Sequence, residues 1–121
     1  MGDVDWQGVA LAALVAFAVL AVAFRNAAAS RTPAWISAGV ALSLIPAVML
    51  GHALARIGPD KLAVKPQLFF MQSGGLALAF VLPALWLTQL RDGIPRRQTA
   101  IDSLAFLIAY LAMGAMFWVR A

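Results

Sequence analysis

The side chain that could take part in the most kinds of chemistry is that of His52, the only histidine in the chain. If the apolar stretches 33–55 and 66–90 form a hairpin, His52 falls at about the same depth as Gln72 and Ser73, roughly 6 and 9 Å from the shared loop. An imidazole can bind a ligand, take up and release a proton, or hydrogen-bond a neighbouring helix. We therefore predict a small polar cluster of these three residues. It would be a ligand site, a proton site or a structural link.

A tetrapyrrole bound through His52 is one form that a ligand site could take. A six-coordinate haem usually needs a second axial ligand, and the sequence has no second histidine. A chlorophyll needs only one such ligand, and Gly51 beside His52 would leave room for the ring. The sequence requires no cofactor, and the identity of any metal stays open.

Asp102 is the only acidic residue within the apolar stretch 99–119. Thr99 and Asp102 have the spacing of a capping box, with aspartate in place of glutamate. An acid in the first turn of a helix is favoured by the helix dipole. We expect a structural role for Asp102, with pairing partners available among Arg91, Arg96 and Arg97.

Other common site chemistries are missing from this sequence. There is no cysteine, which excludes disulfides, thiolate metal sites and cysteine nucleophiles. We find no nucleotide-binding loop, zinc-protease helix, nucleophile elbow or pair of carboxylates. We therefore do not expect an enzyme.

The basic residues point to lipid and not to nucleic acid. The net charge is +4, but the basic residues flank apolar stretches singly or in pairs and are not mixed with stacking aromatic side chains. Positions at the edges of apolar stretches are typical of contacts with lipid headgroups. We expect the partners to be the lipid bilayer and other membrane subunits, or a second copy of the chain.

The elements that must position these residues are apolar helices. Hydrophobic residues make up 64% of the chain and charged residues 12%, whereas soluble domains average about 45–50% and 25%. Four stretches are long enough to cross a hydrocarbon core of about 30 Å: 6–24, 33–55, 66–90 and 99–119. Short connections favour opposite directions for neighbouring helices. The sequence predicts an all-α integral membrane protein, a single membrane domain built as an antiparallel, up-down-up-down bundle of four transmembrane helices.

Proline and glycine mark the expected boundaries. Thr32 and Pro33 have the pattern of an N-cap followed by proline at the first helical position. The pair 58–59, glycine then proline, should stop the second helix. Pro46 and Pro83 lie inside apolar stretches, where proline usually means a kink. The stretch 6–24 follows two acids and no basic residue, so we expect a retained helix and not a signal peptide.

The tryptophans support four crossings. In such a bundle, the alternation of direction places two tryptophans at each membrane interface. Interfacial anchoring predicts this distribution for Trp6, Trp35, Trp86 and Trp118.

Orientation follows from a small charge difference. Five arginines (Arg25, Arg31, Arg91, Arg96 and Arg97) lie on one side and four basic residues (Arg56, Lys61, Lys65 and Arg120) on the other. The positive-inside rule then predicts both termini outside the cytoplasm. Such near balance also permits insertion in both orientations. The alanine- and arginine-rich composition is compatible with a bacterial inner membrane.

Small residues occupy every fourth position of the second stretch. Such a face lets helix backbones approach closely in a membrane, either inside the bundle or against a second copy or a partner subunit. Both interpretations apply to Gly39, Ser43, Ala47, Gly51 and Ala55.

Three functions fit these observations. The leading one is an accessory or assembly subunit of a larger membrane complex, because the chain has no catalytic set and short loops. The second is a small homo-oligomeric transporter or channel, in which proline-broken helices would mark the binding site. The third is a pigment- or quinone-binding membrane subunit.

Overall fold

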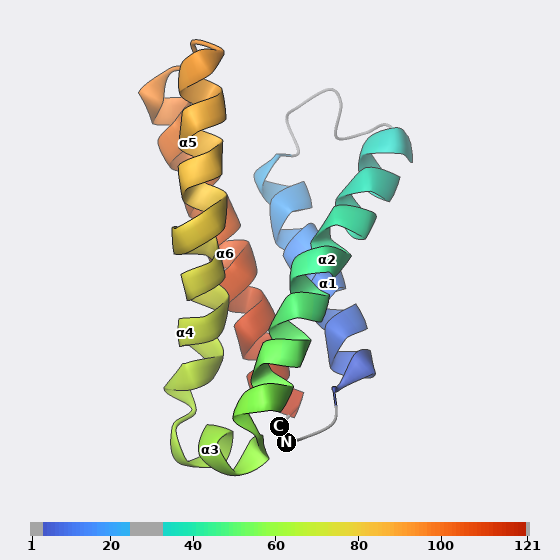
Figure 1. Ribbon diagram of the computed structural model, residues 1–121. Coiled ribbons are helices and arrows are strands. Elements are labelled where there is room, and N and C mark those ends of the chain that lie inside the picture. The colour runs from blue at the N-terminus through green and yellow to red at the C-terminus, as the bar shows by residue number, and fades with distance from the viewer. Residues whose placement is uncertain (1–3, 25–32, 121) are drawn as a thin grey trace.

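The computed structural model describes residues 4–24 and 33–120, and it is helical. Helix accounts for 91% of it, without strands in the described part, which confirms the predicted all-α class. The elements in chain order (Figure 1) are α1 (Trp6–Ala23), α2 (Pro33–Ile57), the short α3 (Pro59–Val64), α4 (Gln67–Leu76), the π-helix η2 (Ala77–Val81), α5 (Leu82–Arg91) and α6 (Arg96–Arg120).

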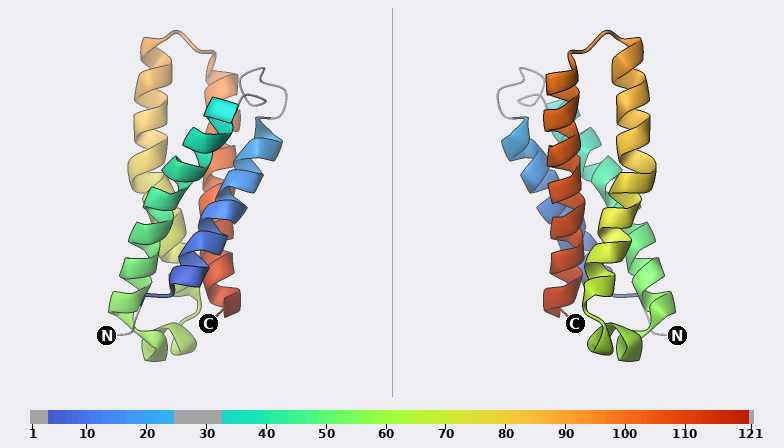
Figure 2. Two further views of the ribbon diagram at one scale, coloured as in Figure 1. Left: turned by 90° about the vertical axis from the view of Figure 1, so that its right-hand side faces the viewer. Right: turned by 90° about the vertical axis from the view of Figure 1, so that its left-hand side faces the viewer.

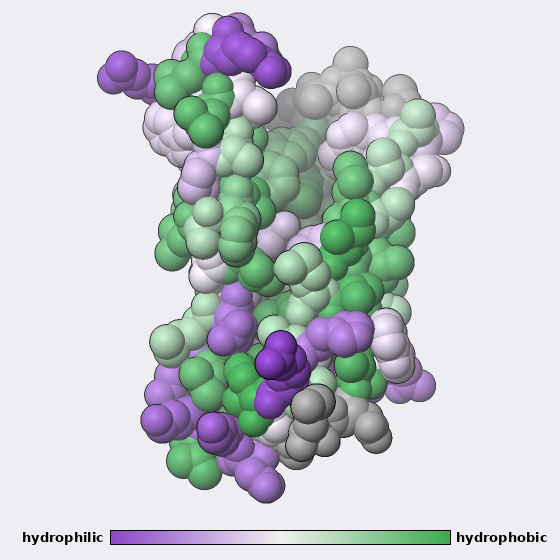
Figure 3. All heavy atoms as spheres, viewed as in Figure 1, coloured by the Kyte–Doolittle hydropathy of each residue, from purple (hydrophilic) through white to green (hydrophobic). Residues whose placement is uncertain are grey.

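Four helices are long and apolar enough to cross a membrane. They are α1, α2, the continuous rod Gln67–Arg91 made of α4, η2 and α5, and α6. Their bounds lie within a few residues of the four predicted stretches. Figure 3 shows hydrophobic residues in a belt between two ends at which hydrophilic residues gather.

Helix α6 has extensive packing interfaces with two other long helices. It packs along α1 on one side and along α4 on the other (Figure 2). At one end of the α1–α6 pair, Asp5 and Arg120 form an ion pair with an Nε–Oδ2 distance of 2.9 Å. Near the other end, the rings of Phe24 and Phe106 lie 6.1 Å apart. These two helices therefore run in opposite directions.

Helix α2 packs on α1 through its face of small residues. A Cβ atom at Gly51 would lie 2.7 Å from Cγ2 of Val9, and one at Gly39 would collide with the ring of Phe17. Ser43, Ala47 and Gly51 are buried, and Gly39 and Ala55 are half-buried. The structure thus places this face against α1 of the same chain, where small residues allow close helix contact.

The rod of α4 and α5 diverges from α2 toward its C-terminal end. Near α3, α4 contacts α2, but farther along the rod α2 and α5 diverge (Figure 1) and share no packing interface of comparable extent. No residue of α5 is buried. Figure 3 shows the resulting hollow between the two columns of helices.

Two local features were not predicted from the sequence. Gly58, with φ of 91°, ends α2 as expected, but Pro59 then opens α3. The π-helix η2 ends two residues before Pro83. A proline ring collides with the carbonyl four residues earlier in a regular α-helix, and a π-helical turn is one way to accommodate that change in hydrogen bonding.

The predicted capping box at Thr99 was wrong. Helix α6 begins at Arg96, so Thr99 is already helical, and its hydroxyl donates to the carbonyl oxygen of Pro95 at 3.4 Å. Helix α5 ends at Arg91, Gly93 turns the chain with a φ of 73°, and α6 begins directly after Pro95. The expected N-cap Thr32 lies outside the described residues, while Pro33 begins α2 as predicted.

Candidate functional site

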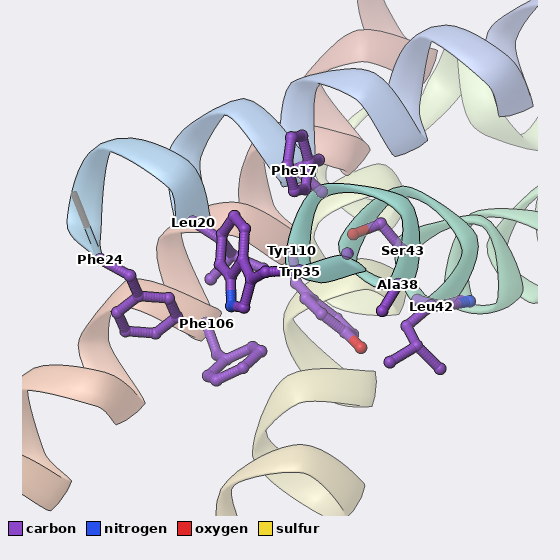
Figure 4. A pocket seen from close by; sticks show the side chains of 12 residues that line it. Phe17, Leu20, Phe24, Trp35, Ala38, Leu42, Ser43, Phe106 and Tyr110 are labelled. Atoms are coloured by element: carbon purple, nitrogen blue, oxygen red, sulfur yellow. The ribbon is translucent and has the colours of Figure 1, made fainter. Parts of the chain in front are cut away.

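Helices α1, α2 and α6 line a cavity of about 250 Å³ that opens to the surface beside the exposed Leu42. Figure 4 shows that its wall is largely aromatic, with rings contributed by all three helices. The aromatic residues that line it are Phe17, Phe24, Trp35, Phe106 and Tyr110.

The local sequence explains why space is left here. Ala16 on α1 and Ala38 on α2 line the cavity with side chains too small to fill the space between helices, whereas Gly39 lies closely against the ring of Phe17. The large rings are held at the edge by one another. Phe17 and Trp35 lie 5.4 Å apart with their planes tilted by 45°, within the range of favourable aromatic pairs.

The lining determines what the cavity can hold. It contains no acid, base or histidine, and its polar groups come from Ser43, Trp35 and Tyr110. In Figure 4 the Tyr110 hydroxyl lies on the side of the cavity nearer Leu42. Such a wall can bind an apolar ring or chain by dispersion and burial of area.

The structure does not bring His52 into this cavity. The imidazole is exposed, and its Nδ1 lies 2.9 Å from the carbonyl oxygen of Val48 in the same helix, an arrangement in which Nδ1 donates. Its ring meets the ring of Trp6 edge-on, with centroids 5.6 Å apart. His52 therefore sits on the outer surface, at the end of the molecule where α1 begins.

Gln72 and Ser73 lie in two other environments. Ser73 is fully buried, its hydroxyl donates to the Phe70 carbonyl oxygen at 3.4 Å, and it packs against Gly114 of α6. Gln72 is half-buried. Successive positions on a helix are rotated by about 100°, so these neighbours face different sides. No hydrogen bond within the described part of the chain joins His52 to either of them.

The tryptophans occupy the two ends in pairs, as the helix directions require. Trp6 and Trp118 lie at the end marked by the Asp5–Arg120 pair, and Trp35 and Trp86 lie toward the other end. Trp118 packs edge-on against Phe70, with centroids 6.0 Å apart. Trp35 lines the cavity.

A polar junction between α5 and α6 was missed at the sequence level. Asp102 accepts hydrogen bonds of 2.8 Å from Nε2 of Gln89 and from Nε2 of Gln98. None of the arginines considered as partners forms an ion pair with Asp102 in the described part of the chain, and Arg91 pairs with Asp92 at 3.1 Å. The available signal was a glutamine and an acid on either side of a tight turn.

The described residues contain no group of three or more His, Cys, Asp or Glu side chains that could hold a metal ion. The aromatic cavity is a concave site formed by α1, α2 and α6. No protein-family model matches the chain, and comparisons with curated proteins and with solved structures found no match either.

Proposed function

We propose that this chain is a multi-pass membrane protein that acts as a small accessory or assembly subunit of a larger membrane complex. In this proposal the four long helices cross the bilayer as an antiparallel bundle. The observation that carries it is the open side of the molecule. Helix α5 has no buried residue, and the hollow between α2 and α5 exposes apolar side chains.

In a membrane, the space between α2 and α5 must be filled by lipid or by another helix. Hydrocarbon tails are as apolar as leucine, so helices associate in a membrane mainly by close van der Waals packing. Within this chain α5 packs on α6 but not on α2. A transmembrane helix of another subunit, lying between α2 and α5, would give both helices a packing partner. Leu42, which is 64% exposed and lines the cavity, would lie in that contact.

The experiment is site-specific photocrosslinking in the native membrane. A photoreactive phenylalanine analogue replaces Leu42 in one variant and Leu14 in the other. Leu14 is the matched control, because it is also an exposed leucine, at 53%, but does not line the cavity. We expect a discrete protein adduct from position 42 and none from position 14.

Other crosslinking results would support a different function or contradict the proposal. An adduct with a second copy of this chain would favour the homo-oligomeric transporter or channel instead. Adducts with lipid alone at both positions would overturn the accessory-subunit proposal. Extraction of the protein by alkaline carbonate would contradict membrane insertion itself.

A quinone-binding subunit is the second candidate, favoured by the aromatic cavity. A volume of about 250 Å³ lies just below the usual range for small-molecule pockets, about 300–1,000 Å³. It suits a single ring or part of a chain, and a whole tetrapyrrole would not fit. A tetrapyrrole on His52 would instead lie on the outer surface beside Trp6.

This candidate is tested by extracting the purified protein with organic solvent and recording the ultraviolet spectrum and mass of what is released. Ser43→Leu narrows the cavity and should reduce retention of a quinone. Ser37→Leu is the control, since Ser37 is exposed on the same helix and lies outside the cavity lining. Absence of any bound molecule from the unmodified protein would refute the candidate.

A further inference from the structure

A second concave region lies at the end of the molecule where α2 turns through α3 into α4. It is a groove of about 800 Å³, and three of its lining residues are basic: Arg56 on α2, Lys61 on α3 and Lys65 after it. We call it the basic groove. It shares no lining residue with the aromatic cavity.

The positive charge of the basic groove is largely uncompensated. The two ion pairs found in residues 4–24 and 33–120 are Arg91–Asp92 and Arg120–Asp5, and neither includes a cation of the groove. Asp60 is the one carboxylate in the lining. The lining therefore favours an anionic ligand.

The lining of the same groove also contains apolar side chains. Ile57, Val64 and Leu68 line it together with the cations. Leu62 of α3 is 8% exposed and fixes this short helix to the core, whereas Val64 is 79% exposed. Helix α3 lies across the end of the long helices (Figure 1), at the level where lipid headgroups meet acyl chains if these helices span a bilayer.

We infer that the basic groove binds an anionic phospholipid. The headgroup phosphate is held by Arg56, Lys61 and Lys65, and the first part of an acyl chain lies along Ile57 and Leu68. Basic residues at this depth attract anionic lipid, and long basic side chains can reach the headgroups from a helix end. The inference rests on the membrane insertion proposed above, but not on the accessory role.

The test measures lipid binding to the purified, delipidated full chain in detergent by native mass spectrometry. The probes are phosphatidylglycerol, phosphatidylcholine and inorganic phosphate. We expect phosphatidylglycerol to bind most tightly. Each groove cation removed should weaken its binding about fivefold, so Lys61→Gln with Lys65→Gln weakens it roughly 25-fold. Asp60→Asn should strengthen it about fivefold, because the repelling carboxylate is lost.

The matched control removes the same charge from the opposite end, with Arg96→Gln and Arg97→Gln, and should leave the affinity of the first bound lipid unchanged. Equal losses from both double variants would overturn the proposal, because attraction would then depend on net charge alone. Competition by inorganic phosphate as strong as that by phosphatidylglycerol would also overturn it, in favour of a free-anion site. Circular dichroism confirms folding, and carbonate extraction tests insertion separately.

Discussion

Gly114 lets α4 and α6 approach each other closely. A Cβ atom at this position would lie 2.7 Å from the Phe69 carbonyl oxygen and would also collide with the Ser73 hydroxyl. The backbone oxygen cannot move aside without shifting α4. Ser73 is thus explained by packing on α6, and it needs no ligand to account for its burial.

We expect Gly114→Ala to lower the free energy of unfolding by about 1–3 kcal/mol, the usual cost of overpacking a filled interior. Gly75→Ala is the control, since a Cβ there meets no atom within 4 Å, and alanine in a helix is better than glycine by about 0.5–1 kcal/mol. Denaturation in detergent micelles measures both changes. Equal effects of the two substitutions would show that α4 and α6 do not approach closely at Gly114.

A second residue-scale prediction concerns pH. The Arg120 guanidinium, which donates to Asp5, lowers the pKa of the Asp5 carboxyl, and the Gly8 backbone N–H, which donates to it at 3.0 Å, lowers the pKa further. A depressed pKa in the folded state stabilises the protein above the unfolded value of about 3.9. That stabilisation is lost as the pH falls through the lower folded value.

The measurement is the unfolding temperature between pH 6 and pH 2, compared with that of Asp5→Asn. The difference between the two proteins should be constant down to about pH 4 and then shrink. A difference independent of pH over this whole range would contradict the contribution of the Asp5 carboxylate.

At the scale of helices, the location of the long helices follows from composition and could be predicted from the sequence. Features that depend on how helices pack could not. Long apolar stretches and flanking prolines located all four long helices, because only helices satisfy their own backbone hydrogen bonds in an apolar environment. The start of α6 was misplaced because Thr99 has a capping pattern that Pro95 overrides. The cavity could not be predicted, since it depends on how Gly39 and Phe17 meet across two helices.

The π-helix gives a prediction for one element. Pro83→Ala restores a backbone N–H and removes the ring that disfavours α-helical bonding to the preceding turn. We expect residues 77–83 to become regular α-helix, with slower amide hydrogen exchange than in the unmodified protein. Pro46→Ala on α2 is the comparison, because α2 is α-helical throughout. Unchanged exchange in residues 77–83 would show that η2 does not depend on Pro83.

At the scale of the whole molecule, the natural lack of cysteine makes orientation measurable. Ala63 on α3 and Asp92 in the α5–α6 turn are exposed and lie at opposite ends of the long helices. The charge balance predicts both termini, and α3 with them, outside the cytoplasm. A thiol reagent that cannot cross membranes should label Ala63→Cys in intact cells and Asp92→Cys only after permeabilisation. The reverse pattern would refute this orientation, and labelling of both in intact cells would indicate insertion in both directions.

Because α1 and α4 both pack on α6, the order in which the helices are synthesised affects when they can come together. Helix α6 is the last of the four long helices to leave the ribosome, yet α1 and the rod of α4 and α5 are joined mainly through it. Until then, the nascent chain holds one helix pair and a third helix with few contacts to that pair. Domains otherwise tend to fold from their N-terminal parts during translation. If these helices insert as proposed, we expect α1 and the rod of α4 and α5 to come together only after the 25 residues of α6 have been made.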